Sequence, residues 1–225
     1  MQCSHLTAMP TSEEAKEEIK MKKKYEYLLF DIGGVLLEHS SGQRIIEWMD
    51  NPVSNEEMSN IWLFSETVRK YERGLIKSKE FAEGIVKELQ LNIDAEAFLE
   101  EFAYFPKGLF PGVEELIKDL SNNYSIACFS NTNELHWSRL CDDFYLDKIV
   151  DRSFLSFKIG FMKPDPEAYN YVINALSCEP CKIIFFDDNK VNVEAAKSAG
   201  MDAVHVLDFS DMKKQLLSIG ILENK

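Results

Sequence analysis

The chain has 225 residues, 45% hydrophobic and 28% charged, a composition that allows a buried globular core and argues against global disorder. Its 38 Asp and Glu outnumber 25 Lys and Arg, and the net charge of -13 disfavours a nucleic-acid partner because phosphate backbones are repelled. No apolar run approaches the roughly 20 residues of a membrane-spanning helix, and no secretory signal follows Met1. We therefore expect a cytoplasmic protein without a membrane partner, and no protein partner is evident.

The N-terminal segment, residues 1–21, is polar and is expected to be a flexible extension. Met21 precedes three lysines and then an apolar stretch, so our hypothesis is that Met21 is the natural start. The stretch Tyr25–Phe30 is aromatic, rich in leucine and too short for a typical helix, which predicts the first strand. This strand ends at Asp31.

Residues 41–106 contain no comparable strand and show apolar residues at helical spacing. Phe98, Phe102 and Phe105 illustrate this spacing, and we expect them to pack inside a helical block. Pro106 and the glycines and proline that follow it are predicted to end the block with turns.

After the helical block, strand-like and helical stretches alternate. Ser125–Phe129 and Ile183–Phe186 are typical of buried strands, and the stretches between and after them favour helices. This alternation predicts an α/β fold, a Rossmann-like parallel sheet with helices on both faces. We assign residues 22–40 and 107–225 to this core and residues 41–106 to a helical cap inserted after the first strand. Such an insert would cover the crevice where open α/β sheets bind ligands.

The five cysteines are odd in number and scattered, which does not indicate a disulfide framework. Cys178 and Cys181 have C-x-x-C spacing, but no second pair or suitably spaced histidine accompanies them as in a zinc site. The pair also precedes a strand, whereas redox pairs usually open a helix after one. We expect no function for this motif.

Polar residues of complementary kinds follow the predicted strands. Asp31 ends the first, Ser130 and Asn131 end the second, and Asp187 with Asp188 end the third, while Lys163 lies in the connection between the last two. The carboxyl ends of parallel strands share one edge of a sheet, so these groups are expected to converge there. A single aspartate at a strand end is usually a turn residue, but the full set in this order indicates a reactive site.

These segments resemble the haloacid dehalogenase-like (HAD) hydrolase superfamily, whose four motifs occur in the same order. The segments that carry the resemblance are Phe30–Leu36, Ser130–Asn131, Lys163–Pro164 and Phe186–Asn189. The insert resembles the C1 cap of that superfamily, and its stretch Tyr71–Ile76 is similar to one found in one branch. The second and fourth motifs resemble in particular the branch that contains α-D-glucose-1-phosphate phosphatase.

The resemblance implies a nucleophile and a metal site. Asp31 would attack phosphorus to form an aspartyl-phosphate, which splits one difficult displacement into two easier ones. Mg²⁺ would neutralise the charge of the phosphate, held by Asp31, the backbone carbonyl of Gly33 and Asp188. Asp187 would be an alternative ligand, or would lie behind the metal and orient Lys163.

The resemblance also implies a phosphate-binding set. Ser130, Asn131, Lys163 and Gly34 would hold the oxygens of the transferring phosphoryl group through side chains and backbone amides. Such preorganised donors stabilise the charge that develops in the transition state.

Gly33 departs from the pattern of most phosphatases in the superfamily, which carry an aspartate two residues after the nucleophile. That aspartate protonates the leaving oxygen, a contribution of about 10²–10⁴-fold in rate. His39 and Glu38 follow the motif closely and are two candidates for the missing donor, although an exposed loop position is the ordinary explanation for both.

The sequence predicts a Mg²⁺-dependent phosphatase of a small phosphorylated metabolite, with a sugar phosphate such as glucose 1-phosphate as one candidate. A haloacid dehalogenase would also use Asp31 as nucleophile, but it needs no metal and so leaves the adjacent Asp187 and Asp188 unexplained. A non-catalytic binding or regulatory protein is the second alternative. Gly33 favours it, and the retained nucleophile, lysine and acids oppose it.

Overall fold

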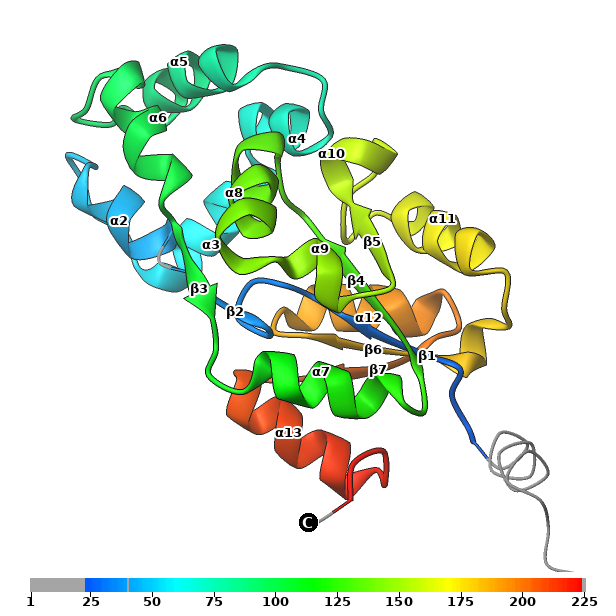
Figure 1. Cartoon of the computed structure of the whole chain (residues 1–225). Coiled ribbons are helices and arrows are strands. Elements are labelled where there is room, and N and C mark those ends of the chain that lie inside the picture. Colours follow the sequence, from blue (N-terminus) through cyan, green and yellow to red (C-terminus); the bar gives the residue numbers. More distant parts are fainter. Residues whose placement is uncertain (1–22, 40, 224–225) are drawn as a thin grey trace, which may run out of the picture.

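Five parallel strands form the central sheet of the computed structural model, which describes residues 23–39 and 41–223 (Figure 1). The N-terminal extension and the hypothesis about Met21 lie outside the described residues. The strand order is β5-β4-β1-β6-β7. The strands are β1 (Tyr27–Phe30), β4 (Ser125–Ser130), β5 (Arg152–Leu155), β6 (Ile183–Asp187) and β7 (Asp202–His205). The predicted parallel sheet is confirmed.

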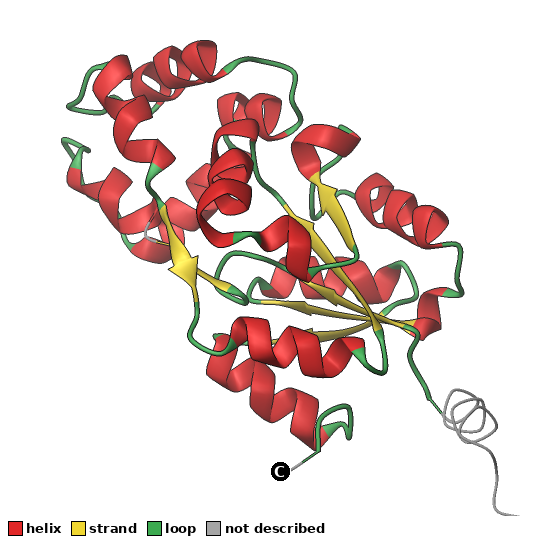
Figure 2. Ribbon diagram, viewed as in Figure 1, coloured by secondary structure: helices red, strands yellow, loops and turns green. Residues whose placement is uncertain are grey.

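Helices cover both faces of this sheet (Figure 2). They are α7 (Val113–Ser121), α8 (Glu134–Phe144), α9 (Leu146–Ile149), α10 (Ser156–Ile159), α11 (Pro166–Leu176), the 3₁₀ helix η1 (Pro180–Lys182), α12 (Lys190–Ser198) and α13 (Phe209–Ser218). Alternate side chains of β1 point to opposite faces, so Leu28 and Phe30 pack in a core with α7 and α13, while Leu29 packs in a second core with α11 and α12. Burial on both faces explains why β1 is apolar without alternation.

A helical insert follows β1 and has an apolar core of its own. We call α2–α6 the insert: α2 (Ser41–Glu47), α3 (Asn55–Phe64), α4 (Glu66–Glu72), α5 (Ser78–Glu88) and α6 (Ala95–Ala103). Phe98, Phe102 and Phe105 are at most 2% exposed in this core, as their spacing predicts. Ser54 opens α3 with a capping box, since its hydroxyl accepts from the Glu57 amide while the Glu57 carboxylate accepts from the Ser54 amide.

A two-stranded antiparallel ribbon joins the insert to the core. It consists of β2 (Leu37–His39), before α2, and β3 (Pro106–Leu109), after α6. The helical block ends close to the predicted point, since α6 stops at Ala103 and the chain turns at Pro111 and Gly112. Pro106 itself is not in a turn, because it is the first residue of β3, where a missing N–H is tolerated. The ribbon brings both connections of the insert together near the end of β1.

The remaining differences from the sequence predictions lie away from the insert. The predictions did not include α13, whose Phe209, Met212 and Leu216 are buried in the core beside α7. Cys178 and Cys181 precede β6 at its amino end, opposite the end that carries Asp187.

In the part of the chain that the structure describes, no helix has the length and apolarity needed to cross a bilayer.

Candidate active site

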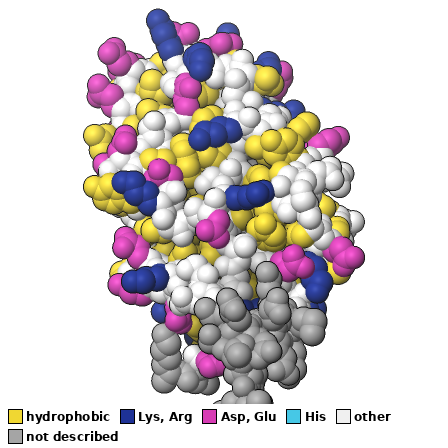
Figure 3. All heavy atoms as spheres, turned by 45° about the vertical axis from the view of Figure 1, so that its right-hand side comes forward, with side chains coloured by type: hydrophobic (Ala, Val, Ile, Leu, Met, Phe, Trp, Pro, Cys, Tyr) yellow, Lys and Arg dark blue, Asp and Glu magenta, His cyan; other side chains and the backbone are white. Residues whose placement is uncertain are grey.

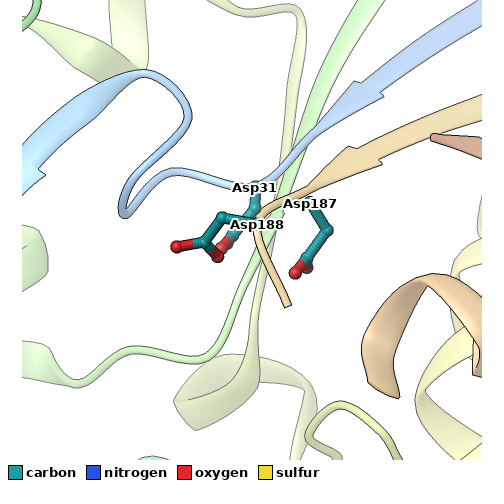
Figure 4. A group of neighbouring side chains, drawn as sticks. All are labelled: Asp31, Asp187 and Asp188. Atoms are coloured by element: carbon teal, nitrogen blue, oxygen red, sulfur yellow. The ribbon is translucent and has the colours of Figure 1, made fainter. Parts of the chain in front are cut away.

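The polar residues predicted to converge do lie at one edge of the sheet. Asp31 directly follows β1, Ser130 is the last residue of β4, and Asp187 is the last residue of β6. The register brings these ends together, since Phe30 pairs with Cys128 of β4 and with Phe186 of β6. Figure 4 shows Asp31, Asp187 and Asp188, whose carboxylate oxygens lie within 4.8 Å of one another.

Lys163 joins this group from the connection between β5 and α11. Its ammonium Nζ lies 2.6 Å from Oδ2 of Asp187 and 3.0 Å from Oδ1 of Asp31, and its side chain is only 1% exposed. Burial alone would lower the pKa of Lys163, but the charges of Asp187 and Asp31 raise that pKa above its ordinary value. The lysine is therefore a fixed positive charge beside the candidate nucleophile.

Asn131 holds the backbone of Lys163 in place. Its side-chain Nδ2 donates to the Lys163 carbonyl at 2.8 Å, and its Oδ1 accepts from the Lys163 amide at 2.8 Å. The Asn131 side chain therefore positions the lysine. Ser130, a residue that is 5% exposed, lines the cavity together with Asp31, and its hydroxyl donates to the Asn131 carbonyl at 3.3 Å.

The two adjacent acids at the end of β6 have different surroundings. Asp187 is fully buried, and its oxygens accept hydrogen bonds from Lys163, from the Asn189 amide at 2.7 Å and from the Asn192 side chain at 3.1 Å. Asp188 is accessible from the cavity. Asp187 is thus occupied in orienting Lys163, and Asp188 is the acid whose oxygens face the cavity.

Gly34 allows Asp188 to approach the loop after the nucleophile. A Cβ atom at position 34 would meet Oδ2 of Asp188 at 2.3 Å, and the φ of Gly34 is +72°, a conformation that favours glycine. The loop therefore needs glycine here both for its backbone and for the carboxylate beside it.

The electrostatics of this group fit a cation. Burial is the main reason that the pKa of Asp31 rises to about 7 and that of Asp188 to about 6. The charge of Lys163 lowers both pKa values, and the neighbouring carboxylates raise them. Carboxylates that repel one another at such short range are stabilised by a hard divalent ion, and oxygen donors are what Mg²⁺ prefers. The residues present therefore fit a magnesium site.

His39 fills the space beside Gly33. A Cβ atom at position 33 would meet Cδ2 of the His39 ring at 2.8 Å and Nε2 at 3.1 Å. His39 lines the cavity, and burial lowers the pKa of its imidazole. Both His39 and Glu38 have exposed surface, but Glu38, the other candidate for the proton donor, is not among the residues that line the cavity. Of the two, the structure brings His39 to the position of the missing acid.

A cavity of about 300 Å³ lies between this edge of the sheet and the insert. Asp31, Ser130, Lys163 and Asp188 form its floor, and residues of α2, α3 and α4 and the end of α6 form much of its opposite wall. Its position agrees with the rule that open α/β sheets bind ligands beyond the carboxyl ends of their strands.

Glu72 is a cavity residue that the sequence did not predict. It is 8% exposed, and burial is the main reason that its pKa rises to about 7. Its only signal in the sequence is its place in the stretch Tyr71–Ile76.

His136 also lines the cavity, with Nε2 at 2.7 Å from the Phe102 carbonyl, whereas the adjacent Trp137 packs in the core.

A sequence profile of the haloacid dehalogenase-like hydrolases matches residues 25–200, which include every element of this site. The chain belongs to this family. It is therefore a HAD-like hydrolase, as the four motifs indicated.

Named relatives of the chain act on different phosphate esters. It is 27% identical to flavin mononucleotide hydrolase 1 of Arabidopsis thaliana, over 91% of this chain and 82% of that protein. It is 23% identical to D-ribitol-5-phosphate phosphatase of Bacteroides thetaiotaomicron, over 85% of this chain and 97% of that protein. The resemblance to the glucose-1-phosphate phosphatase branch stays a prediction.

Solved structures share the fold. A HAD family enzyme from Bacteroides thetaiotaomicron, a variant in complex with magnesium and inorganic phosphate, matches with a TM-score of 0.65 and 25% identity, over 81% of this chain and 94% of that one. The L-2-haloacid dehalogenase of Xanthobacter autotrophicus matches with a TM-score of 0.58 and 20% identity, over 88% of this chain and 84% of that one. The second likeness concerns the fold alone.

Proposed function

We propose that the protein is a Mg²⁺-dependent phosphatase that hydrolyses a small phosphate monoester through a phosphorylated Asp31. The observation that carries the proposal is the placement of Asp31 between a fixed ammonium group, Lys163, and a second carboxylate that faces the cavity, Asp188. A carboxylate nucleophile with a positive charge and a cation site beside it is suited to attack on phosphorus.

The residues that would hold Mg²⁺ are Asp31, Asp188 and the backbone carbonyl of Gly33. The ion would neutralise charge on the phosphate and on the attacking carboxylate. Asp187 supports the site from behind, since its oxygens already accept hydrogen bonds from Lys163, Asn189 and Asn192.

The protein's own groups would then act in two displacements. In the first, a carboxylate oxygen of Asp31 attacks phosphorus and the alcohol leaves, while Lys163 and the Ser130 hydroxyl hold the phosphoryl oxygens. In the second, water attacks phosphorus, the bond from phosphorus to the Asp31 oxygen breaks and phosphate leaves, while the group that gave up its proton in the first step takes a proton from the water. His39 lies where a side chain of residue 33 would be, and its protonated form would give a proton to the leaving alcohol. Because burial lowers the pKa of this imidazole, acidic pH favours the protonated form.

The relatives support a phosphorylated small molecule as the substrate. Besides the flavin mononucleotide and ribitol 5-phosphate enzymes, they include a phosphorylated carbohydrates phosphatase of Thermotoga maritima, 25% identical over 87% of this chain and 91% of that protein. A sugar phosphate, glucose 1-phosphate included, is one candidate. The cluster of three acids weighs against a dehalogenase, which has no use for a metal site.

Phosphate release from p-nitrophenyl phosphate tests this function. We expect turnover with Mg²⁺, loss of turnover with EDTA, and a loss of at least about 10³-fold in Asp31→Asn, which keeps the size of the side chain but removes the nucleophile. Metal-independent halide release from a 2-haloacid would instead identify a dehalogenase. Absence of both activities would support the non-catalytic alternative.

A further inference from the structure

The wall that the insert presents to the cavity is mostly hydrocarbon. Its apolar members come from α2, α3 and the end of α6: Ile45, Met58, Trp62, Leu63, Phe102 and Phe105. Trp62 and Leu63 are half-buried and expose most of this surface, whereas the other four are at most 2% exposed. The floor, by contrast, carries the charged groups of the strand ends. The two sides of the cavity therefore suit two different parts of one ligand.

Few polar side chains of the insert reach the cavity. Among its described residues these are Ser59 and Glu72. The carboxyl group of Glu72 already takes part in a hydrogen bond with the side chain of Trp62, which lies in the same wall. The insert thus offers little to a ligand that carries several hydroxyl groups.

From this contrast we infer that the substrate is a phosphate monoester whose organic part is compact and apolar, such as a carbocycle or branched hydrocarbon. This substrate class would replace the polyhydroxylated sugar phosphate that the relatives suggest. The inference rests on the proposed phosphatase function and names its substrate class. The phosphate would lie on the floor beside Asp31 and Lys163, and the organic part would lie against Trp62 and Leu63.

Physical chemistry favours an apolar group at this wall. Burial of hydrocarbon against hydrocarbon is favourable, whereas a hydroxyl group taken from water and left without a partner is destabilised. A hexose would bring several such groups to a wall with two polar side chains. The volume of about 300 Å³ is at the lower end for ligand pockets and suits a compact organic part.

Cyclohexylmethyl phosphate and glucose 6-phosphate form a matched pair for the test. Each has a six-membered ring and a primary phosphate ester, so they differ chiefly in the hydroxyl groups and the ring oxygen. Each is measured as a competitive inhibitor of p-nitrophenyl phosphate hydrolysis with Mg²⁺, so that the result does not depend on how fast either is cleaved. We expect cyclohexylmethyl phosphate to have an inhibition constant at least about 10²-fold lower.

Two Leu→Gln variants assign this preference to the wall. Leu63 on α3 lines the cavity, and Leu99 on α6 is equally half-buried in the insert but does not line it. We expect Leu63→Gln to reduce the ratio of the two inhibition constants about tenfold and Leu99→Gln to leave it unchanged. A ratio is insensitive to the fraction of folded protein, so a loss of stability does not imitate the effect.

The outcomes distinguish a failure of the inferred substrate class from a failure of the proposed phosphatase function. Hydrolysis of p-nitrophenyl phosphate, with glucose 6-phosphate binding as well as or better than its partner, overturns the substrate class and leaves the phosphatase intact. An unchanged ratio in Leu63→Gln overturns the role of the wall. Failure to hydrolyse p-nitrophenyl phosphate with Mg²⁺ overturns the proposed function, and the inference with it.

Discussion

At the scale of single residues, the ring of His39 occupies the space that a side chain at position 33 would fill. The position that would hold a side chain two residues after Asp31 is taken by an imidazole from the end of β2. A glycine at position 33 is therefore consistent with an active enzyme, because another group able to transfer a proton fills the gap.

His39→Gln should slow the hydrolysis of alkyl phosphates by about 10²–10⁴-fold, since glutamine fills a similar space but does not transfer a proton. The loss should be smaller for p-nitrophenyl phosphate, whose leaving group needs little protonation. The measurement is kcat/KM for both ester types with Mg²⁺.

Two further variants control this prediction. Glu38→Gln changes the exposed neighbour and should leave both rates unaltered. Gly33→Asp combined with His39→Ala places a carboxyl group in the same space and should recover part of the alkyl phosphate activity. Equal losses for alkyl and aryl esters in His39→Gln would contradict a role in protonating the leaving group.

At the scale of elements, α4 connects the insert to the loop that carries Lys163. Arg69 donates to Oδ2 of Asp165 at 2.7 Å, and Arg73 pairs with the same carboxylate. Both pairs are half-buried, so solvent screening limits their contribution to stability to about 1 kcal/mol or less each. Their geometry still orients α4, whose last residue is Glu72.

The turn after α4 fits closely against the core. Gly74 has a φ of +72°, and a Cβ atom there would meet the carbonyl oxygen of Phe157 in α10 at 2.5 Å. Gly220 has the same φ but nothing within 4 Å of its Cβ position. Gly220→Ala should therefore cost about 1–2 kcal/mol of unfolding free energy from backbone conformation alone, and Gly74→Ala more.

Denaturant unfolding of both variants measures the difference between their free energies of unfolding. This difference reports the contact between the turn after α4 and α10. Displacement of α4 should also raise the KM for p-nitrophenyl phosphate in Gly74→Ala and not in Gly220→Ala. Equal destabilisation by the two substitutions would mean that the turn after α4 yields without disturbing α10.

The sequence predicted those elements whose pattern of apolar and polar residues lies within the element itself. β1, β4 and β6 are short apolar runs, and a parallel arrangement then brings their final polar residues together. The contact of Glu72 with the cavity could not be predicted, because it depends on how the insert folds back over the sheet. In the sequence His39 is a candidate only because it follows the first motif closely, and its place beside Gly33 depends on the ribbon of β2 and β3. The strands β2 and β3 are three and four residues long and include Pro106, which is a signal for a turn.

At the scale of the whole molecule, the net charge is strongly acidic. On the face drawn in Figure 3, acidic and basic side chains alternate with apolar ones, and no broad patch of one sign is visible there. The net charge of -13 is thus a poor guide to the site. There the sign of the local field depends on Lys163 and on the protonation of Asp31 and Asp188.

Those acids couple the stability of the molecule to pH and metal. In the metal-free protein the pKa of Asp31 is about 7 and that of Asp188 about 6, against 3.8 for an ordinary aspartate. The folded state therefore binds more protons than the unfolded state between these values, and its stability falls as pH rises from about 4 to about 7. Mg²⁺ binds the deprotonated acids, so it should restore stability mainly at the upper end of this range.

Thermal unfolding at about pH 5 and about pH 7.5, with and without Mg²⁺, measures this coupling. At 100 times the dissociation constant the ion should add about 2.7 kcal/mol near pH 7.5 and much less near pH 5, where protons compete for the same oxygens. Asp188→Asn removes one of the raised acids, so it should flatten the pH dependence without metal and weaken the effect of Mg²⁺. An equal shift in Tm at both pH values would place the ion elsewhere on the acidic surface, because exposed carboxylates are already ionised at the lower pH.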